Sequence, residues 1–180
     1  MTKLEKVNTI PVSGESEEVI FDLPDSCQGQ EWNFVKFTLP DDINWYGHFR
    51  EKYFKGSFCQ AVLPEKGIAC IVSGGHGIII DILKREKLID IDIPRIVDIY
   101  ADNETNTFYV SNWQSLHFID EKLSVIKMPI PVTFTFDGIL FKKVNRRKLY
   151  FEFEYPNTAY VKNHDYYIDL DTKEIKKSNL

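Results

Sequence analysis

Short apolar runs, many of them alternating with polar residues, follow one another along most of the chain. From residue 57 onward they are separated by small clusters of Asp, Asn, Gly, Pro and Ser, which are typical turn residues. The pattern therefore predicts an all-β fold in which antiparallel strands are joined by hairpins. The strands are expected at 57–63, 68–72, 78–83, 88–93, 96–100, 107–111, 116–119, 123–128, 139–144, 148–155, 159–161, 166–170 and 174–177.

One phrase recurs in this pattern: apolar residues, then Ile-Asp, then a polar turn. It ends at Asp81, Asp120 and Asp169, so the intervals are 39 and 49 residues. Four short strands with tight turns occupy about this length. Because an Asp side chain can accept hydrogen bonds from backbone amides just ahead of it, we interpret each Asp as a residue that closes a hairpin.

On this repeat, residues 57–180 resemble the blades of a β-propeller, in which four-stranded units recur every ~40–50 residues. Residues 96–128 would form one complete four-stranded meander, and 139–177 a second one with a longer hairpin. The WD dipeptide is absent, and so is the kelch pattern of a double glycine with its accompanying aromatic residues. Since two or three blades are fewer than the four to eight of a closed ring, the resemblance implies an incomplete propeller. A β-sandwich is the alternative.

Residues 1–56 lack the repeat and are expected to be less regular. Residues 19–21 and 32–39 have strand composition, whereas 41–56 favours a short helix or an ordered loop, because Asp41 or Asp42 can cap a helix. The chain is interpreted as a single domain, 1–180, with an irregular part (1–56) and a part of repeated meanders (57–180).

The amino-acid composition limits the classes of partner that we expect the protein to bind. The net charge is −5 and the pI is about 5.4. An acidic surface disfavours nucleic acid and anionic membranes, and it suits a basic protein. The three cysteines, Cys27, Cys59 and Cys70, have no CxxC spacing and are interpreted as reduced thiols. With no secretory signal or membrane-spanning run in the sequence, we expect a cytoplasmic protein.

Few residues in the sequence are candidates for catalysis or for binding a metal or cofactor. The glycine-rich segment 73–77 lacks the residues of a phosphate-binding loop, so it is interpreted as a hairpin turn. His48, His76, His117 and His164 show no metal-ligand spacing. Cys59 and Cys70 have no base near them in the sequence. We therefore expect no catalytic residue, metal or cofactor.

The favoured function is a non-enzymatic, acidic protein-binding module, most concretely an inhibitor of a basic protein, such as the immunity protein of a bacterial toxin. Acidic and aromatic residues would occlude the partner, although Trp45 and Tyr46 could instead plug a sheet edge. The alternation of 151–155 places two of the carboxylates on one strand face. The predicted partner-binding residues are Asp41, Asp42, Trp45, Tyr46, Trp113, Glu152 and Glu154.

Two alternatives stay open. One is a small-ligand-binding or enzymatic β-domain with a pocket at a sheet mouth, which converging His, Asp and Cys side chains with shifted pKa values would favour. The other is a subunit that completes a β-sheet in a larger assembly. Unpaired sheet edges could also pair two copies into a homo-oligomer.

Overall fold

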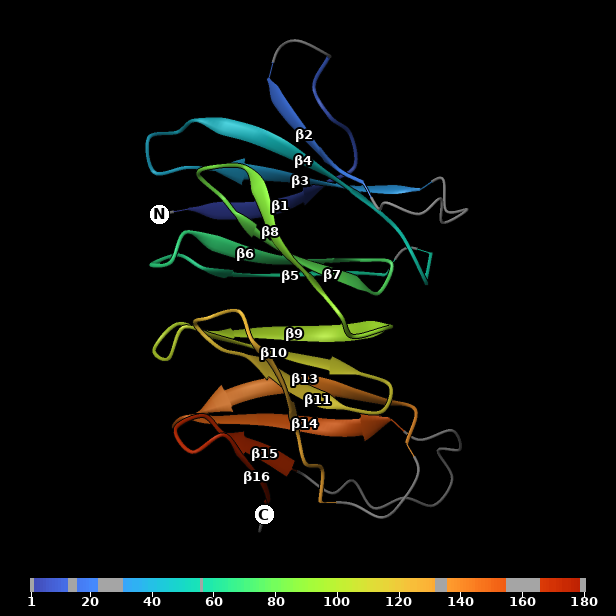
Figure 1. Ribbon diagram of the computed structural model, residues 1–180, viewed down its shortest axis with the longest axis vertical. Helices are drawn as coiled ribbons and strands as arrows, with labels where there is room; N and C mark the ends of the chain where they lie inside the picture. The colour runs from blue at the N-terminus through green and yellow to red at the C-terminus, as the bar shows by residue number, and fades with distance from the viewer. Residues whose placement is uncertain are drawn as a thin grey trace. The chain divides into compact units, whose positions relative to one another are not determined.

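The computed structural model describes residues 2–12, 16–22, 31–55, 57–131, 136–154 and 166–178. Within these described residues the chain forms four four-stranded sheets and no helix (Figure 1), so the all-β prediction is confirmed. The predicted strand at 159–161 lies outside the described residues. The strands are β1 (Lys3–Val7), β2 (Glu17–Phe21), β3 (Trp32–Thr38), β4 (Asn44–Arg50), β5 (Phe58–Leu63), β6 (Ile68–Ser73), β7 (His76–Asp81), β8 (Glu86–Ile91), β9 (Ile96–Asp102), β10 (Thr107–Asn112), β11 (Leu116–Ile119), β12 (Val125–Met128), β13 (Gly138–Asn145), β14 (Lys148–Glu154), β15 (Tyr166–Asp169) and β16 (Glu174–Lys177).

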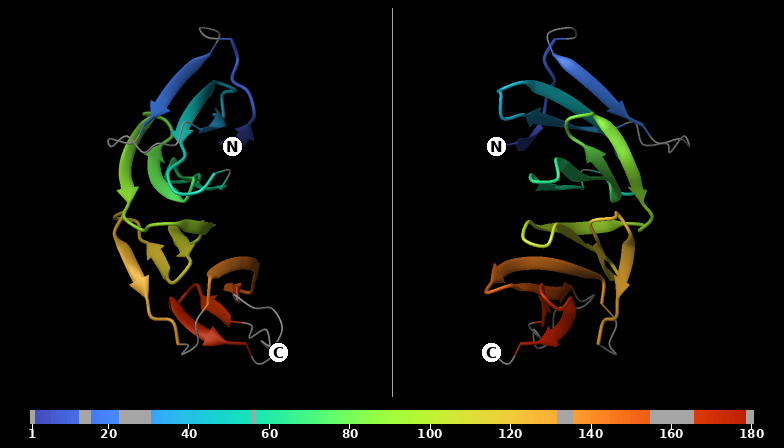
Figure 2. Two further views of the ribbon diagram at one scale, coloured as in Figure 1. Left: turned by 90° about the vertical axis from the view of Figure 1, so that its right-hand side faces the viewer. Right: turned by 60° about the vertical axis from the view of Figure 1, so that its left-hand side comes forward.

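Three of the sheets are simple antiparallel meanders whose strands follow the chain order: β5 to β8, β9 to β12, and β13 to β16. We call them the second, third and fourth sheets. The meanders predicted at 96–128 and 139–177 are thus confirmed as four-stranded sheets. The strands of each sheet are twisted relative to one another (Figure 2), as the chirality of L-residues requires.

The first sheet corrects two expectations about residues 1–56. Its strands are ordered β1-β3-β4-β2, with β2 parallel to β4, so the described part of this region is a regular sheet. Residues 44–50 form strand β4 and not the expected short helix or ordered loop. The reason is a period of two: Trp45, Gly47 and Phe49 are buried, and the residues between them face outward. A Cβ at Gly47 would lie 2.6 Å from the Phe49 ring, so the glycine makes room for that ring.

The chain divides into two compact units, Met1–Arg95 and Ile96–Leu180, and each contains two sheets that share a core. In the first unit, Val35, Phe37 and Trp45 of the first sheet pack with Ile71 and Ile80 of the second sheet in one buried cluster. Such burial of large apolar side chains is the main stabilising contribution to each unit.

In the second unit the third and fourth sheets share a core that includes Tyr109 and Phe151. Two polar contacts also join these sheets. The Ser111 hydroxyl donates to the Ile139 carbonyl oxygen at 2.7 Å. The Phe141 amide donates to Asp98 Oδ2 at 2.9 Å.

The recurring Asp closes a turn at each predicted position. In each case Oδ1 accepts two backbone amides from the turn, which satisfies donors that the hairpin leaves unpaired. Asp102, which follows Ala101 and not an Ile, accepts one turn amide: the Glu104 amide donates to its Oδ1 at 3.3 Å, and the Thr105 hydroxyl donates to its Oδ2 at 2.6 Å. The amide pairs are those of Leu83 and Lys84 at Asp81 (3.0 and 2.9 Å), of Lys122 and Ser124 at Asp120 (3.0 and 2.9 Å), and of Asp171 and Thr172 at Asp169 (3.2 and 3.1 Å).

Candidate functional site

Asp41 and Asp42 lie at the tip of the β3–β4 hairpin, which we call the acidic tip (residues 39–43). The Leu39 amide donates to the Ile43 carbonyl at 2.9 Å, and the Asp42 amide donates to the Leu39 carbonyl at 3.0 Å. Asp42 has a φ of 60°, a conformation that Asp tolerates better than most residues. Both aspartates are exposed, and neither forms an ion pair with another described residue. Ile43 beside them is 48% exposed.

Trp45 is fully buried and stacks on Phe37, with the ring centroids 3.9 Å apart and the planes 5° from parallel. This side chain therefore belongs to the core, as in the alternative in which it plugs the sheet. Tyr46 faces the other side of β4 and is half-buried. Trp113 lies in the β10–β11 turn and is 39% exposed.

Glu152 and Glu154 alternate along β14 with the buried Phe151 and Phe153, as the pattern predicted. Glu152 forms an ion pair with Lys142. Glu154 is exposed at the end of the strand. The predicted partner-binding residues therefore fall into two groups, one in each unit, and among them the structure brings only Asp41 and Asp42 together on one turn.

Sequence reasoning missed a polar site beside the β6–β7 hairpin. Gly74 and Gly75 form the two-residue turn with φ values of +56° and +78°, so the prediction of a hairpin turn at 73–77 is confirmed. The Tyr53 and Phe54 amides both donate to the Gly74 carbonyl, at 2.6 and 3.0 Å. Segment 51–54 is therefore held tightly against this turn.

The same segment is anchored by a buried polar network. The Asn33 side-chain amide donates to Glu51 Oε1 and to the Ser73 hydroxyl, at 2.9 Å each. The Ser73 hydroxyl in turn donates to the Phe49 carbonyl at 3.0 Å. Because the Ser73 hydroxyl is buried and already bonded on both sides, it is a structural group and not an available nucleophile.

His76 opens strand β7, and its side chain is only 12% exposed. Its Nε2 lies 3.1 Å from Asp90 Oδ1, and Lys87 Nζ lies 2.6 Å from Asp90 Oδ2. An ionised carboxylate only accepts hydrogen bonds, so we assign the proton of the neutral ring to Nε2. The Nδ1 atom is then left as an acceptor.

The pKa values of this pair are shifted in a consistent way. Burial lowers the pKa of His76, and the ammonium groups of Lys52 and Lys87 lower it further, against the opposing effect of Asp90. Burial alone would raise the pKa of Asp90, but hydrogen bonds from Lys87 and His76 outweigh it and bring that pKa below its usual range. At neutral pH the pair is therefore a neutral imidazole beside a carboxylate.

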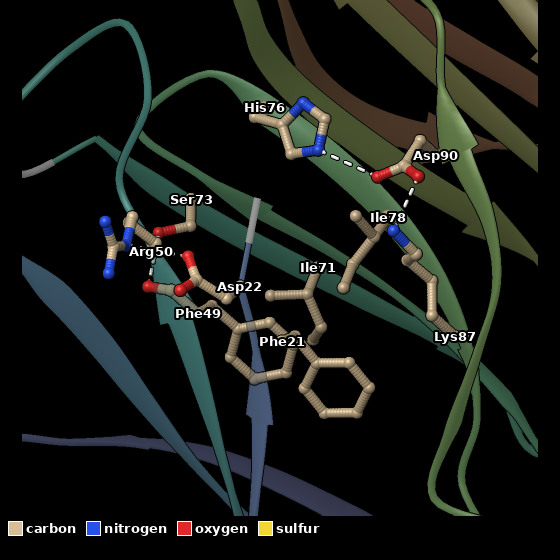
Figure 3. A pocket seen from close by; sticks show the side chains of 10 residues that line it. All are labelled: Phe21, Asp22, Phe49, Arg50, Ile71, Ser73, His76, Ile78, Lys87 and Asp90. Carbon is tan, nitrogen blue, oxygen red and sulfur yellow. Dashed lines mark hydrogen bonds and ion pairs between the residues drawn. The ribbon is translucent and has the colours of Figure 1, made fainter. Parts of the chain in front are cut away.

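Two cavities border this pair, and both include His76 and Asp90. The smaller one, shown in Figure 3, has a volume of about 10 Å³, which is room for about one water molecule. The stacked rings of Phe21 and Phe49, 5.0 Å apart, line it together with Ile71 and Ile78.

The larger cavity has a volume of about 390 Å³, within the usual range of small-molecule sites. We call it the His76 pocket. It combines charged groups with apolar ones, so it can offer ionic, hydrogen-bonding and apolar contacts to a single molecule. Its lining residues are Lys52, Tyr53, His76, Asp90, Ile91, Asp92, Ile93 and Pro94.

Among the described residues, no group of three or more His, Cys, Asp or Glu side chains is placed to hold a metal ion. Cys70 is buried, and burial raises the pKa of its thiol well above the usual value. Cys59 is partly exposed, and neither thiol lines the His76 pocket.

The chain matches no protein-family model, and no curated protein is significantly similar to it. Within the described ranges, no helix has the length and the apolar character that a membrane crossing requires.

Proposed function

We propose that the protein is a non-enzymatic protein-binding module that occludes a basic protein, in the way that an immunity protein occludes a bacterial toxin. One observation carries the proposal: two exposed carboxylates without an ionic partner among the described residues stand on a hydrogen-bonded hairpin tip beside an exposed Ile43. Carboxylates around an apolar contact match the polar rim and apolar centre of protein interfaces.

The charge distribution favours the first unit as the binding unit. Residues 1–95 hold 15 Asp and Glu against 11 Lys and Arg, a net charge of −4. Residues 96–180 hold 12 against 11, a net charge of −1. The negative field is thus concentrated in the unit that carries the acidic tip, and such a field accelerates the encounter with a basic partner.

Hydrogen bonds within the acidic tip also preorganise it for binding. Thr38 Oγ1 donates to Asn44 Oδ1 at 2.8 Å, and Asn44 Nδ2 donates to the Asp42 carbonyl at 3.2 Å. A tip held in this way loses little conformational freedom on binding. Asp41 and Asp42 would contact basic groups of the partner, and Ile43 would pack between them. Trp45 is omitted from the interface because it is buried.

Tyr46 of the first unit, and Trp113, Glu152 and Glu154 of the second, remain proposed secondary contacts. A toxin that acts in the cytoplasm would be met there, so the proposal includes a cytoplasmic location. We further propose that the second, third and fourth sheets, within residues 57–180, are blade-like units of the kind found in β-propellers. Support comes from the simple four-stranded meander of each of the three.

The direct experiment uses the protein encoded by the reading frame next to this one. The two proteins are co-expressed, growth is recorded, and binding is measured by calorimetry with the purified proteins. We expect the neighbour to be basic and toxic alone, and this protein to bind it and restore growth. A toxic neighbour that this protein neither binds nor neutralises would contradict the proposal, as would a neighbour without toxicity.

A further inference from the structure

We propose that the His76 pocket is a binding site for a small monocarboxylate whose remaining part is apolar. This inference goes beyond protein binding and uses a different place. The acidic tip precedes β4, whereas Lys52 and Tyr53 follow it. The seven residues of β4 separate the two places by roughly 20 Å at the usual rise of a strand.

Lys52 supplies the positive charge for the carboxylate. Its ammonium lies 5.3 Å from the centroid of the Tyr53 ring, and it forms no ion pair with a carboxylate of the described residues. The other nearby ammonium, that of Lys87, already holds Asp90. Lys52 is therefore the cation of this pocket that an anionic ligand can engage.

His76 supplies the second polar contact. Its Nε2 is directed to Asp90, which fixes the ring, and Nδ1 remains for a ligand. When a carboxylate neutralises Lys52, one of the charges that disfavour imidazolium is offset. The ring then takes up a proton more readily and can donate from both nitrogens, to Asp90 and to the ligand. Binding is thereby coupled to proton uptake, so affinity should rise as the pH falls.

The other charged groups near the ring limit the ligand's charge. Lys87 and His76 both contact the Asp90 carboxylate and offset its negative charge, but the Asp92 carboxylate is exposed at the same pocket. Asp22 and Arg50, which border the small adjoining cavity, form an ion pair at 2.8 Å. With a single unpaired ammonium and a nearby carboxylate, the pocket suits one negative charge better than the two of a phosphate dianion.

The remaining lining residues form an apolar wall for the body of the ligand. Tyr53 is 42% exposed and Pro94 is exposed, so these two offer most of the apolar surface, whereas Ile91 and Ile93, which also line the pocket, are only 2% and 4% exposed. Apolar surface that a ligand removes from water contributes about 25 cal/mol per Å² before the costs of binding. An aromatic or branched carboxylate should therefore bind more tightly than acetate.

The pocket is built in advance by the double-glycine turn. A Cβ on Gly74 would lie 2.4 Å from the Lys52 amide nitrogen and 2.8 Å from the Glu51 Cα. Only glycine allows segment 51–54 to lie this close, and the hydrogen bonds to the Gly74 carbonyl keep it there. Lys52 and Tyr53 are thus placed beside His76 without a ligand.

The test titrates the full-length protein with benzoate, acetate and inorganic phosphate, at pH 6.0 and pH 7.5, by calorimetry and by NMR of the histidine ring protons. We expect saturable binding of benzoate, weaker binding of acetate, and an affinity for benzoate at least about threefold higher at pH 6.0. The His76 resonance should shift toward imidazolium as benzoate binds.

Variants separate this site from a general charge effect. Lys52→Met should weaken benzoate binding about tenfold or more, and His76→Gln should remove its pH dependence. Lys55→Met is the matched control, because it removes the same charge from an exposed residue three positions away. Urea unfolding of each variant shows that it is folded.

Three results would overturn the inference: no saturable binding of benzoate, equal losses in Lys52→Met and Lys55→Met, or phosphate binding more tightly than benzoate. A variant with Asp41→Asn and Asp42→Asn should bind benzoate like the wild type. Failure of the partner-binding proposal is therefore distinguishable from failure of this one.

Discussion

Asp102 and Arg147 join the third and fourth sheets through a two-pronged ion pair: Arg147 Nη1 lies 2.7 Å from Asp102 Oδ1, and Nη2 lies 2.9 Å from Oδ2. The Asp102 side chain is only 3% exposed. Burial alone would raise its pKa, but hydrogen bonds from Arg147 and Thr105 bring that pKa below its usual range. Replacing this carboxylate removes the partner of Nη1 and Nη2, although Nε of Arg147 keeps its contact with Asp171 Oδ1 at 2.9 Å.

We therefore expect Asp102→Asn to lower the free energy of unfolding by about 3 kcal/mol, the lower end for one partner lost from a buried pair. Arg147 keeps some contact with solvent, which limits the loss. Urea unfolding measures it. Glu104→Gln is the control, because Glu104 lies 3.4 Å from the same Arg147 but is 73% exposed. Its effect should stay within about 0.5 kcal/mol, and equal effects of the two variants would refute this account of the pair.

Gly74 and Gly67 allow backbone strain to be separated from steric exclusion. Both have positive φ, +56° and +66°, but a Cβ on Gly67 meets nothing within 4 Å, whereas one on Gly74 meets the Lys52 amide at 2.4 Å. Gly67→Ala should cost about 1 kcal/mol from backbone strain alone. Gly74→Ala should cost about 3 kcal/mol or more, because segment 51–54 must also move. Similar unfolding free energies for both variants would show that segment 51–54 does not depend on Gly74.

The turn-closing role of the recurring Asp can be tested at Asp81. Asp81→Ala removes the acceptor of the Leu83 and Lys84 amides and should lower the free energy of unfolding by about 1 kcal/mol. Asp81→Asn keeps a carbonyl oxygen in the same place and should remain within about 0.5 kcal/mol of the wild type. Thermal unfolding of the two variants measures the difference. A loss of stability in Asp81→Asn equal to that in Asp81→Ala would mean that the negative charge of Asp81 contributes more than its hydrogen bonds to the turn.

The stability of the first unit should fall as the pH is lowered through the range where histidines titrate. The pKa of His76 is lower in the folded protein than its usual value of 6.5. The unfolded chain therefore takes up this proton first, and stability present above pH ~6.5 is lost progressively below it. Urea unfolding at pH 7.5, 6.5 and 5.5 should show this loss, and His76→Gln should reduce its slope.

A second histidine contributes in the same direction. Burial lowers the pKa of His117, and Lys127 lowers it further. His117→Gln should therefore also reduce the slope, with an effect on the second unit. If His76→Gln left the pH dependence unchanged while His117→Gln removed all of it, the assignment to His76 would be wrong.

The hairpins of this fold follow from sequence because they depend on local features. The Asp-containing turns, the double glycine at 74–75 and the apolar runs each mark a strand end within a few residues. Strand β4 was harder to predict from the sequence, since Asn44–Arg50 mixes aromatic residues with Gly47 and shows its period of two only when burial is known. The burial of Trp45 likewise shows that this side chain belongs to the core and is not a surface anchor.

The His76 pocket could not be predicted for a more specific reason. Strands β7 and β8 pair with a register shift between Ile79 and Ile80. Without that bulge, continuing the pairing from Asp81 and Glu86 would place Ile91 opposite His76, and Asp90 on the other face. The bulge moves the register by one residue, which brings Asp90 to the side of His76. Sequence alone gives no sign of this shift.

The acidic tip is tested most directly by the affinity for the neighbouring gene's protein as its charges are removed. Calorimetry would compare the wild type, a variant with Asp41→Asn and Asp42→Asn, and Glu65→Lys, at low and at high salt. Both variants change the net charge by the same two units, but Glu65 is exposed on a different hairpin, the β5–β6 turn. We predict at least about tenfold weaker binding and a reduced salt dependence for the double variant alone. Unchanged binding in the double variant, or an equal loss in Glu65→Lys, would contradict a binding role for the acidic tip.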